Sequence, residues 1–322
     1  MFSLEELDRA KQIVYGQMLP TPTLHWPQLS ARLGCEYWLK HENHTPTGAF
    51  KVRGGLVYCQ MLANEAFKGE LITATRGNHG QSIPFAARSF GFPVTVYVPH
   101  GNAEEKNQAM RHWGAQLVEF GNDFDEAREQ AVVTAQRQQM HMVGSFHPNL
   151  VVGVATYVDE IFQQIKHTPD VIYVPIGMGS GACAVVLMRD LLNLKTQVVG
   201  VVSNHADAFA RSFTQGKIVE SKTAQTFADG VATRVPHPDA FAVLERGLER
   251  VVGVDDEEVA QAVRMIFTTT HNVAEGAGAI ATAAAYKERT QLKGKSVVGI
   301  LTGGNIDAAW LASILQGELP SL

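Results

Sequence analysis

The feature that most constrains the fold is a regular alternation of short apolar runs with helical stretches, from about residue 70 to residue 301. The apolar runs predict strands at 70–75, 93–98, 116–120, 141–144, 171–176, 197–202, 251–254 and 296–301. The stretches between them predict helices at 79–89, 104–113, 123–138, 151–166, 181–192, 256–270 and 276–289. Such alternation favours parallel strands joined by right-handed crossovers, so we expect an α/β fold with parallel sheets flanked by helices.

The first seventy residues follow a different pattern. Ser3 and Glu6 form a capping-box pair that predicts a helix reaching about residue 14. Pro20, Pro22 and Pro27 then predict an extended entry segment. An apolar run at 36–39 precedes a polar loop, after which a helix is expected over 52–65.

Composition excludes several classes of function. A chain of 322 residues can bury a large core, and its net charge of −5 without a basic run argues against a nucleic-acid partner. No apolar run approaches membrane-spanning length, and the acidic N-terminus is unlike a signal peptide, so we expect a soluble cytoplasmic protein. The three cysteines have unrelated spacings and are expected to be reduced thiols. The chain is also expected to form a homodimer.

The stretch from Lys40 to Gly55 reads K-H-E-N-H-T-P-T-G-A-F-K-V-R-G-G and places Lys51 where a loop meets a helix. A helix N-terminus disfavours a cation, and partial burial lowers the pKa of an amine. A neutral amine in such a place is a good nucleophile toward carbonyl groups. The competing interpretation is a solvated Lys51 at a helix start and Arg53 as a surface charge, because most lysines are surface residues.

The segment P-T-G-A-F-K-V-R-G-G resembles the lysine motif of fold-type II pyridoxal-phosphate (PLP) enzymes, in the branch of threonine ammonia-lyases (threonine/serine dehydratases) and serine racemases. That motif usually reads P-T-G-S-F-K-x-R-G-A, so Ala49 and Gly55 are departures that leave the amine in place. The resemblance implies that Lys51 carries the cofactor as a Schiff base, with Phe50 beside it. It also implies a large PLP-binding domain at 1–51 and 147–322, with a small α/β domain inserted at 52–146.

A second motif, A-T-R-G-N-H-G-Q, follows a predicted strand and opens a helix. Free N–H groups at a helix N-terminus suit a carboxylate, although a plain strand–helix turn would look similar. The motif resembles the family's substrate-carboxylate loop, which implies that Asn78 holds the cofactor's 3′ oxygen. It also implies that the substrate carboxylate is bound by Thr75, Arg76, Gly77, Asn78 and His79. Arg76 stands where serine racemases keep a serine as a second acid/base, and a permanently charged guanidinium is a poor proton shuttle.

The loop from Gly177 to Gly181 reads G-M-G-S-G at the end of a predicted strand. A dinucleotide fingerprint would need a third glycine one position later and a carboxylate closing the next strand, so NAD is disfavoured. A tight glycine loop with free N–H groups fits a single phosphate, and a ligand-free turn is the alternative. It resembles the family's tetraglycine phosphate loop, which implies phosphate binding by Gly177, Met178, Gly179, Ser180 and Gly181.

Two further segments complete the resemblance. T-G-G-N at 302–305 implies that Thr302 places a hydroxyl on the pyridine nitrogen, a weaker electron sink than a carboxylate would create, which favours elimination over transamination. Glu275, in A-E-G-A-G, is expected either to face the cofactor or to be an ordinary carboxylate at a helix N-terminus. The divalent-metal site of serine racemases would fall on Val202 and Ala208, which cannot ligate a hard cation, so no metal is expected.

Together these motifs predict a PLP-dependent lyase, a dehydratase that converts a β-hydroxy-α-amino acid such as L-threonine or L-serine to a 2-oxo acid and ammonia. The alternatives within the cofactor class are an amino-acid racemase, a β-replacement enzyme, and a dehydratase of 3-hydroxyaspartate or phenylserine. Arg76 counts against racemisation, and the G-N-H-G-Q loop counts against β-replacement. A PLP-binding regulator without turnover is a further alternative, as is an NAD-dependent oxidoreductase.

Overall fold

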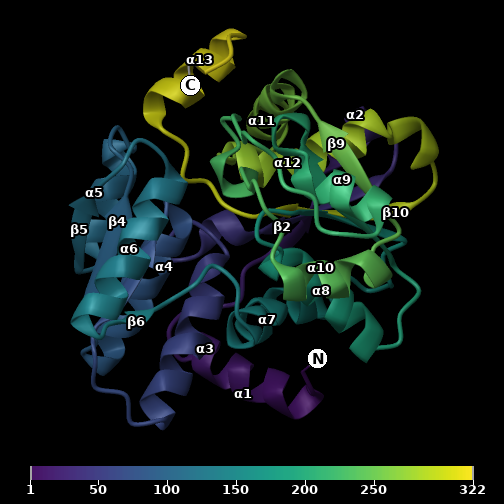
Figure 1. The fold of residues 1–322 in the computed structure, drawn as a ribbon. Coiled ribbons are helices and arrows are strands. Elements are labelled where there is room, and N and C mark those ends of the chain that lie inside the picture. The colour runs from purple at the N-terminus through teal and green to yellow at the C-terminus, as the bar shows by residue number, and fades with distance from the viewer. Residues whose placement is uncertain (1, 321–322) are drawn as a thin grey trace.

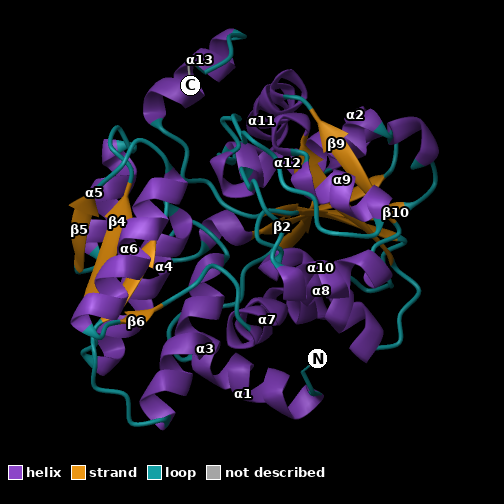
Figure 2. Ribbon diagram, in the orientation of Figure 1, coloured by secondary structure: helices purple, strands orange, loops and turns teal. Residues whose placement is uncertain are grey.

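The computed structural model describes residues 2–320, which form two α/β units, each built around its own sheet (Figures 1 and 2). The larger sheet has the order β1 (Thr23–His25), β2 (Glu36–His41), β10 (Ser296–Leu301), β7 (Val171–Pro175), β8 (Gln197–Ser203) and β9 (Arg250–Val254). The smaller has the order β5 (Ala115–Glu119), β4 (Val94–Val98), β3 (Leu71–Ala74) and β6 (His141–Met142). All neighbouring strands are parallel except β1 and β2, which confirms the predicted α/β class.

The larger sheet is covered by helices on both faces, as its side chains show. In β7, Val171 and Tyr173 pack into a core with α11 (Asp256–Thr270) and α12 (Gly276–Lys287). The alternate residues Ile172 and Val174 pack into the core that includes α7 (Pro148–Gln164), α8 (Ser180–Leu191) and α10 (Pro238–Gly247). Burial on both faces explains why these strands are apolar throughout rather than alternating with polar residues.

The smaller sheet carries α4 (Asn78–Ala87), α5 (Glu104–His112) and α6 (Phe124–Gln138), on the left in Figure 1. Helix α3 (Lys51–Asn64) packs against both α4 and α7 and therefore connects the two units. Two glycines allow α3 and α7 to approach closely, since a Cβ on Gly153 would lie 2.3 Å from the Arg53 carbonyl oxygen. On the α3 side, a Cβ on Gly54 would lie 2.8 Å from the Leu150 carbonyl oxygen.

A group of buried charged side chains holds α3 against α7 and the end of β2. Arg53, 0% exposed, donates from Nε to Glu42 at 2.7 Å and from Nη1 to Glu160 at 2.7 Å. Lys40, also 0% exposed, donates to Glu160 at 2.5 Å and to the Thr21 carbonyl oxygen at 2.7 Å. Two cations and two anions, from α3, α7, β2 and the turn after β2, thus neutralise one another. The interpretation of Arg53 as a surface charge is wrong, because its side chain is fully buried. Only the fold brings Glu160 to it, since the two residues are 107 positions apart.

The N-terminal helix α1 (Leu4–Tyr15) begins after Ser3 with the predicted capping box. Three helices were not predicted: α2 (Pro27–Leu33), α9 (Ala208–Gln215) and α10, two of which begin at a proline in a stretch that read as extended or irregular. The last helix is α13 (Ala308–Gln316), which projects from the body at the top of Figure 1. Within residues 2–320, no helix is long and apolar enough to cross a membrane.

The strands and helices otherwise follow the prediction to within a few residues, with two informative differences. The strand expected at 141–144 is only two residues long, because β6 pairs with β3 over Leu71 and Ile72 alone. Helix α7 begins three residues before its expected start. His147 caps it by accepting a hydrogen bond from the Asn149 N–H, and Pro148 occupies the first turn, where a proline is favoured.

Candidate active site

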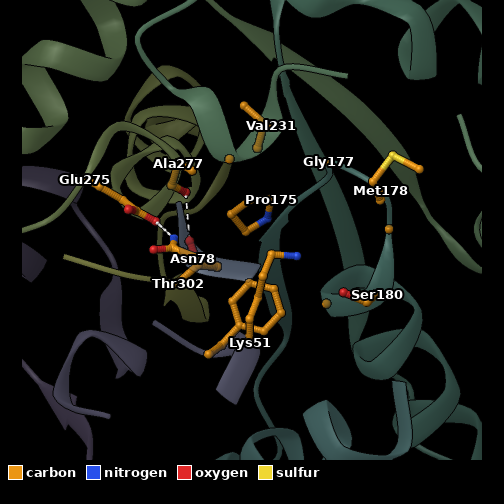
Figure 3. A pocket seen from close by; sticks show the side chains of 14 residues that line it. Lys51, Asn78, Pro175, Gly177, Met178, Ser180, Val231, Glu275, Ala277 and Thr302 are labelled. Atoms are coloured by element: carbon orange, nitrogen blue, oxygen red, sulfur yellow. Dashed lines mark hydrogen bonds between the residues drawn. The ribbon is translucent and has the colours of Figure 1, made fainter. Parts of the chain in front are cut away.

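A cavity lies where loops from the two units converge. The sequence-predicted residues on its wall are Phe50, Lys51, Asn78, Gly177, Met178, Gly179, Ser180, Gly181, Glu275 and Thr302. These residues come from five separate segments of the chain, and Figure 3 shows their side chains around one space.

Lys51 is the first residue of α3, and its side chain extends into the cavity (Figure 3). Its Nζ lies 5.1 Å from the centre of the Phe50 ring. The loop before it is tied to the opposite wall, because the Phe50 N–H donates to the Thr302 carbonyl oxygen at 3.0 Å. Burial lowers the pKa of Lys51 to about 8, and the Glu275 carboxylate partly opposes this shift. Roughly a tenth of the amine is therefore unprotonated at pH 7, far more than for an ordinary lysine with a pKa of about 10.4.

The glycine loop joins β7 to α8 and forms a cradle on the cavity wall. Gly179 precedes the helix with φ of +96°, a conformation that glycine adopts without strain. Gly177 is packed tightly, since a Cβ there would lie 2.4 Å from the Gly230 carbonyl oxygen. The unpaired N–H groups at the start of α8 and the buried Ser180 hydroxyl make this cradle suited to a phosphate.

Glu275 immediately precedes α12 and lines the cavity at only 3% exposure. Burial raises its pKa to about 7, and the negative charge of Asp229 adds to the shift. Lys106, Asn78 and Lys51 oppose it. Glu275 therefore occupies the helix start and also lies on the cavity wall.

Thr302 follows β10, and its hydroxyl donates to the Ala277 carbonyl oxygen at 3.1 Å, shown by a dashed line in Figure 3. The second dashed line joins Asn78 Nδ2 to Glu275 Oε1 at 2.7 Å. Asn78 is the first residue of α4, so this bond links the smaller unit to the larger one across the cavity.

The structure does not bring all of the predicted carboxylate loop to the cavity. Thr75, Gly77 and His79 are buried nearby, and Arg76 is exposed, but none of the four belongs to the cavity wall. The Gly77 N–H donates to Thr75 Oγ1 at 3.0 Å, which shapes the turn. Burial and the nearby Lys51 lower the pKa of His79 to about 3, so its imidazole is neutral.

Sequence reasoning missed part of the site. Gly230 and Val231, in the segment F-A-D-G-V-A, also line the cavity but are not among the site residues predicted from the sequence. Next to them, Asp229 accepts a bond from Lys106 Nζ at 2.5 Å, joining the two units at the cavity's edge. The sequence signal for this loop was an acid followed by small residues. The partner of Asp229, Lys106, lies 123 residues away in the chain, so the pairing could not be read from the sequence.

The two positions that correspond to the divalent-metal site of serine racemases carry apolar side chains. Val202 is buried in β8, and Ala208 is buried at the start of α9. The neighbouring Asp207 is engaged elsewhere, accepting from Arg211 Nε at 3.1 Å and from the Ser221 hydroxyl at 3.0 Å. In the part of the chain that the structure describes, no cluster of three or more His, Cys, Asp or Glu residues is placed to hold a metal.

The residues of the cavity fit pyridoxal phosphate in three separate ways. A primary amine of lowered pKa enters the cavity, and an anion cradle opens on the same space. The half-buried amide of Asn78 and the buried hydroxyl of Thr302 add polar groups to the wall. An aldehyde, a phosphate and a polar aromatic ring would each find a partner of suitable chemistry.

Comparison with known proteins agrees with this fit. The model of the pyridoxal-phosphate dependent enzyme family matches residues 14–303. An L-threonine ammonia-lyase of Thermotoga maritima is 31% identical over 320 residues, which cover 99% of this chain and 79% of that one. An L-threonine ammonia-lyase of Geobacter sulfurreducens is 35% identical over 303 residues, covering 93% and 74%.

Solved structures show the same fold. The processed form of threonine deaminase isoform 2 from Solanum lycopersicum superposes with a TM-score of 0.87 at 27% identity, covering 98% of this chain and 94% of that chain. Maize serine racemase gives a TM-score of 0.90 at 22% identity, covering 98% and 97%. The second likeness concerns the fold alone.

Proposed function

Because the chain belongs to the pyridoxal-phosphate dependent enzyme family, in its threonine dehydratase branch, we propose that it is a lyase that removes water from a β-hydroxy-α-amino acid. L-Threonine and L-serine are the proposed substrates, and a 2-oxo acid and ammonia are the products. The observation that carries the proposal is the meeting of the Lys51 amine, the glycine cradle and Thr302 on one cavity.

The residues that would hold the cofactor divide into three groups. Lys51 would hold it covalently through its amine, and the cradle from Gly177 to Gly181 would bind its phosphate. Asn78 and Thr302 would bind the oxygen and the nitrogen of its ring. When bound, pyridoxal phosphate supplies an electron sink that acidifies the α-hydrogen of an attached amino acid.

Lys51 is the group that moves the α-proton. As a free amine its pKa of about 8 makes it both an adequate base near neutral pH and an ammonium able to return the proton. Lys51 lies at the start of α3, and the preceding Phe50 N–H is bonded to the Thr302 carbonyl oxygen after β10. This anchoring of the backbone keeps Nζ in the cavity. The start of α4 offers backbone N–H groups for the substrate carboxylate, which orients the α-hydrogen.

Thr302 favours elimination over transamination. A hydroxyl is a weak acid and does not protonate a ring nitrogen as a carboxylic acid would. Negative charge that develops at the α-carbon is therefore relieved by departure of the β-hydroxyl. Arg76 is exposed and stays charged, so the second face of the substrate has no proton donor at this position, which counts against racemisation.

Three further assignments are part of the proposal. The chain divides into a large domain at 1–51 and 147–322 and a small domain at 52–146, which is supported by the position of all four strands of the smaller sheet between Leu71 and Met142. The protein acts as a homodimer, and it acts in the cytoplasm. Sedimentation equilibrium of the purified protein tests the homodimer, and fractionation of cells tests the location.

The experiment that tests the function is a panel of L-threonine, L-serine, threo-3-hydroxyaspartate and phenylserine, with detection of the 2-oxo acid. We expect turnover of L-threonine or L-serine, and loss of many orders of magnitude in Lys51→Ala, because one amine serves both attachment and proton transfer. Absence of turnover with all four substrates, in protein that binds the cofactor, would favour a regulator without catalysis. Preference for either of the last two substrates would place the protein elsewhere among the dehydratases.

A further inference from the structure

The T-G-G-N segment ends in Asn305, a residue for which the proposed chemistry has no task, yet its side chain is one of the best-connected polar groups at the site. The Asn305 amide donates from Nδ2 to the Thr47 carbonyl oxygen at 2.8 Å. The same nitrogen donates to Asn78 Oδ1 at 2.8 Å. Asn78 in turn donates from Nδ2 to Glu275 Oε1 at 2.7 Å.

This chain of bonds has a direction that is set by the backbone. The Thr47 carbonyl can only accept, so Asn305 must present its NH₂ group there. The second hydrogen of that group needs an acceptor, so Asn78 must turn its oxygen toward Asn305. The NH₂ group of Asn78 then points to Glu275 and the cavity, with one of its two hydrogens on the carboxylate and the other free.

Two glycines make room for this relay. Gly48 has φ of +69°, and a Cβ there would lie 2.4 Å from Asn305 Oδ1. Gly303 lies on the other side, where a Cβ would come within 2.6 Å of Glu275 Oε1. One glycine from the lysine loop and one from the segment of Asn305 itself therefore admit the two polar side chains at the ends of the relay.

We infer that Asn305 is a positioning residue, which fixes the orientation of the Asn78 amide so that its free N–H is presented to the ring oxygen of the cofactor. The inference rests on the proposed assignment of Asn78 to that oxygen. Without Asn305, an ionised Glu275 alone would still hold the amide, because a carboxylate accepts from Nδ2. A protonated Glu275 can donate instead, so the Asn78 amide would be free to rotate and present its oxygen.

The groups facing Glu275 set the pH at which this happens. Burial raises the pKa of Glu275 to about 7, and Asp229 from the loop after α9 adds to the shift, while Lys106 of α5 and Lys51 of α3 oppose it. Its protonation therefore changes within the working range of pH. With Asn305 present, the orientation of Asn78 does not depend on that proton.

The test compares Asn305→Asp and Asn305→Ala by titrating apoprotein with pyridoxal 5′-phosphate and following absorbance. Asp has the size of Asn but can only accept, so it turns the Asn78 NH₂ group away from the cavity, and we expect at least a roughly tenfold rise in Kd at any pH. In Asn305→Ala, only Glu275 orients the Asn78 amide. We therefore expect a small rise in Kd at a pH about one unit above the pKa of Glu275, and a several-fold rise at a pH about one unit below it. Asn64→Asp, the same exchange at an exposed site on α3, is the control and leaves Kd unchanged.

A merely space-filling Asn305 predicts the reverse order, with Asp tolerated better than Ala. That order, or a Kd for Asn305→Asp within about threefold of wild type, would overturn the inference. Should Asn305→Asp melt early, Asn305→Asp/Glu275→Gln restores the melting temperature, because Gln can donate to the rotated Asn78, but it leaves Kd high. Recovery of both quantities in this double variant would also overturn it. Failure of wild-type apoprotein to bind the cofactor would refute the proposed function, and that result is separate from every outcome above.

Discussion

Replacement of Arg53 by Met tests how much the buried charge group contributes to the fold. The guanidinium donates to Glu42 and Glu160 at 2.7 Å each, and all three side chains are buried. Met fills a similar volume without charge, so the loss is electrostatic rather than a cavity. The substitution leaves the two buried carboxylates of Glu42 and Glu160 with Lys40 as their single cation.

The expected cost follows from that imbalance. Removing one partner of a buried ion pair typically destabilises a protein by about 3–5 kcal/mol. An unfolding entropy of roughly 2.1 cal/mol/K per residue gives about 0.7 kcal/mol per kelvin for this chain, so about 4 kcal/mol lowers Tm by about 6 °C. Differential scanning calorimetry of the apoprotein near neutral pH measures the shift.

Helix α1 provides a matched control. Arg9 and Glu5 form an ion pair of the same 2.7 Å length, but their side chains are 58% and 81% exposed. An exposed pair contributes roughly 0–1 kcal/mol, so Arg9→Met should lower Tm by no more than about 1.5 °C.

The double variant Arg53→Met/Glu42→Gln restores neutrality between Lys40 and Glu160 and should recover a substantial part of the loss. If Arg53→Met melted within about 1.5 °C of the wild type, the buried charges would not stabilise α3 in the manner described. A double variant less stable than Arg53→Met would contradict the charge-balance explanation in particular.

Three further predictions concern the site itself. The rate at which apoprotein captures pyridoxal phosphate should rise as pH increases from 7 to 9 with a midpoint near the Lys51 pKa of about 8, and a rise continuing unchanged to pH 10 would show an ordinary lysine. Arg76→Ser should leave KM within about twofold of the wild-type value because the side chain is exposed, and a tenfold increase would return Arg76 to the substrate carboxylate. Activity should survive EDTA, since Val202 and Ala208 offer no oxygen ligands, and loss that Mg²⁺ or Ca²⁺ reverses would reveal another site.

The strands and helices around the cavity could be predicted because their signals are local. Apolar runs such as 296–301, and the capping box at Ser3, report the backbone directly, so the α/β class and most helix positions follow from the sequence. Helices α9 and α10 were missed because they lie in a long segment between β8 and β9 that contains charges, prolines and glycines throughout. Their helical state depends on packing against α8 and β9.

The motif residues could also be located in sequence, but their partners could not. Lys51, the glycine cradle and Thr302 each follow a local pattern, and the fold brings them to one cavity. The partner of Arg53 at position 160 and the partner of Asn78 at position 275 lie more than a hundred residues away. Such distant pairings determine which charge is buried and which amide faces the ligand, and no local spacing records them.

The most direct test of Lys51 as the attachment point is reduction of the cofactor-bound protein with borohydride, followed by digestion and peptide mass spectrometry. The mass of reduced pyridoxyl phosphate is expected on the peptide that contains Lys51, and Lys51→Ala should yield no labelled peptide. Label on a different lysine, or label at Lys51 that is no more abundant than on exposed lysines, would contradict the assignment of this cavity as the active site.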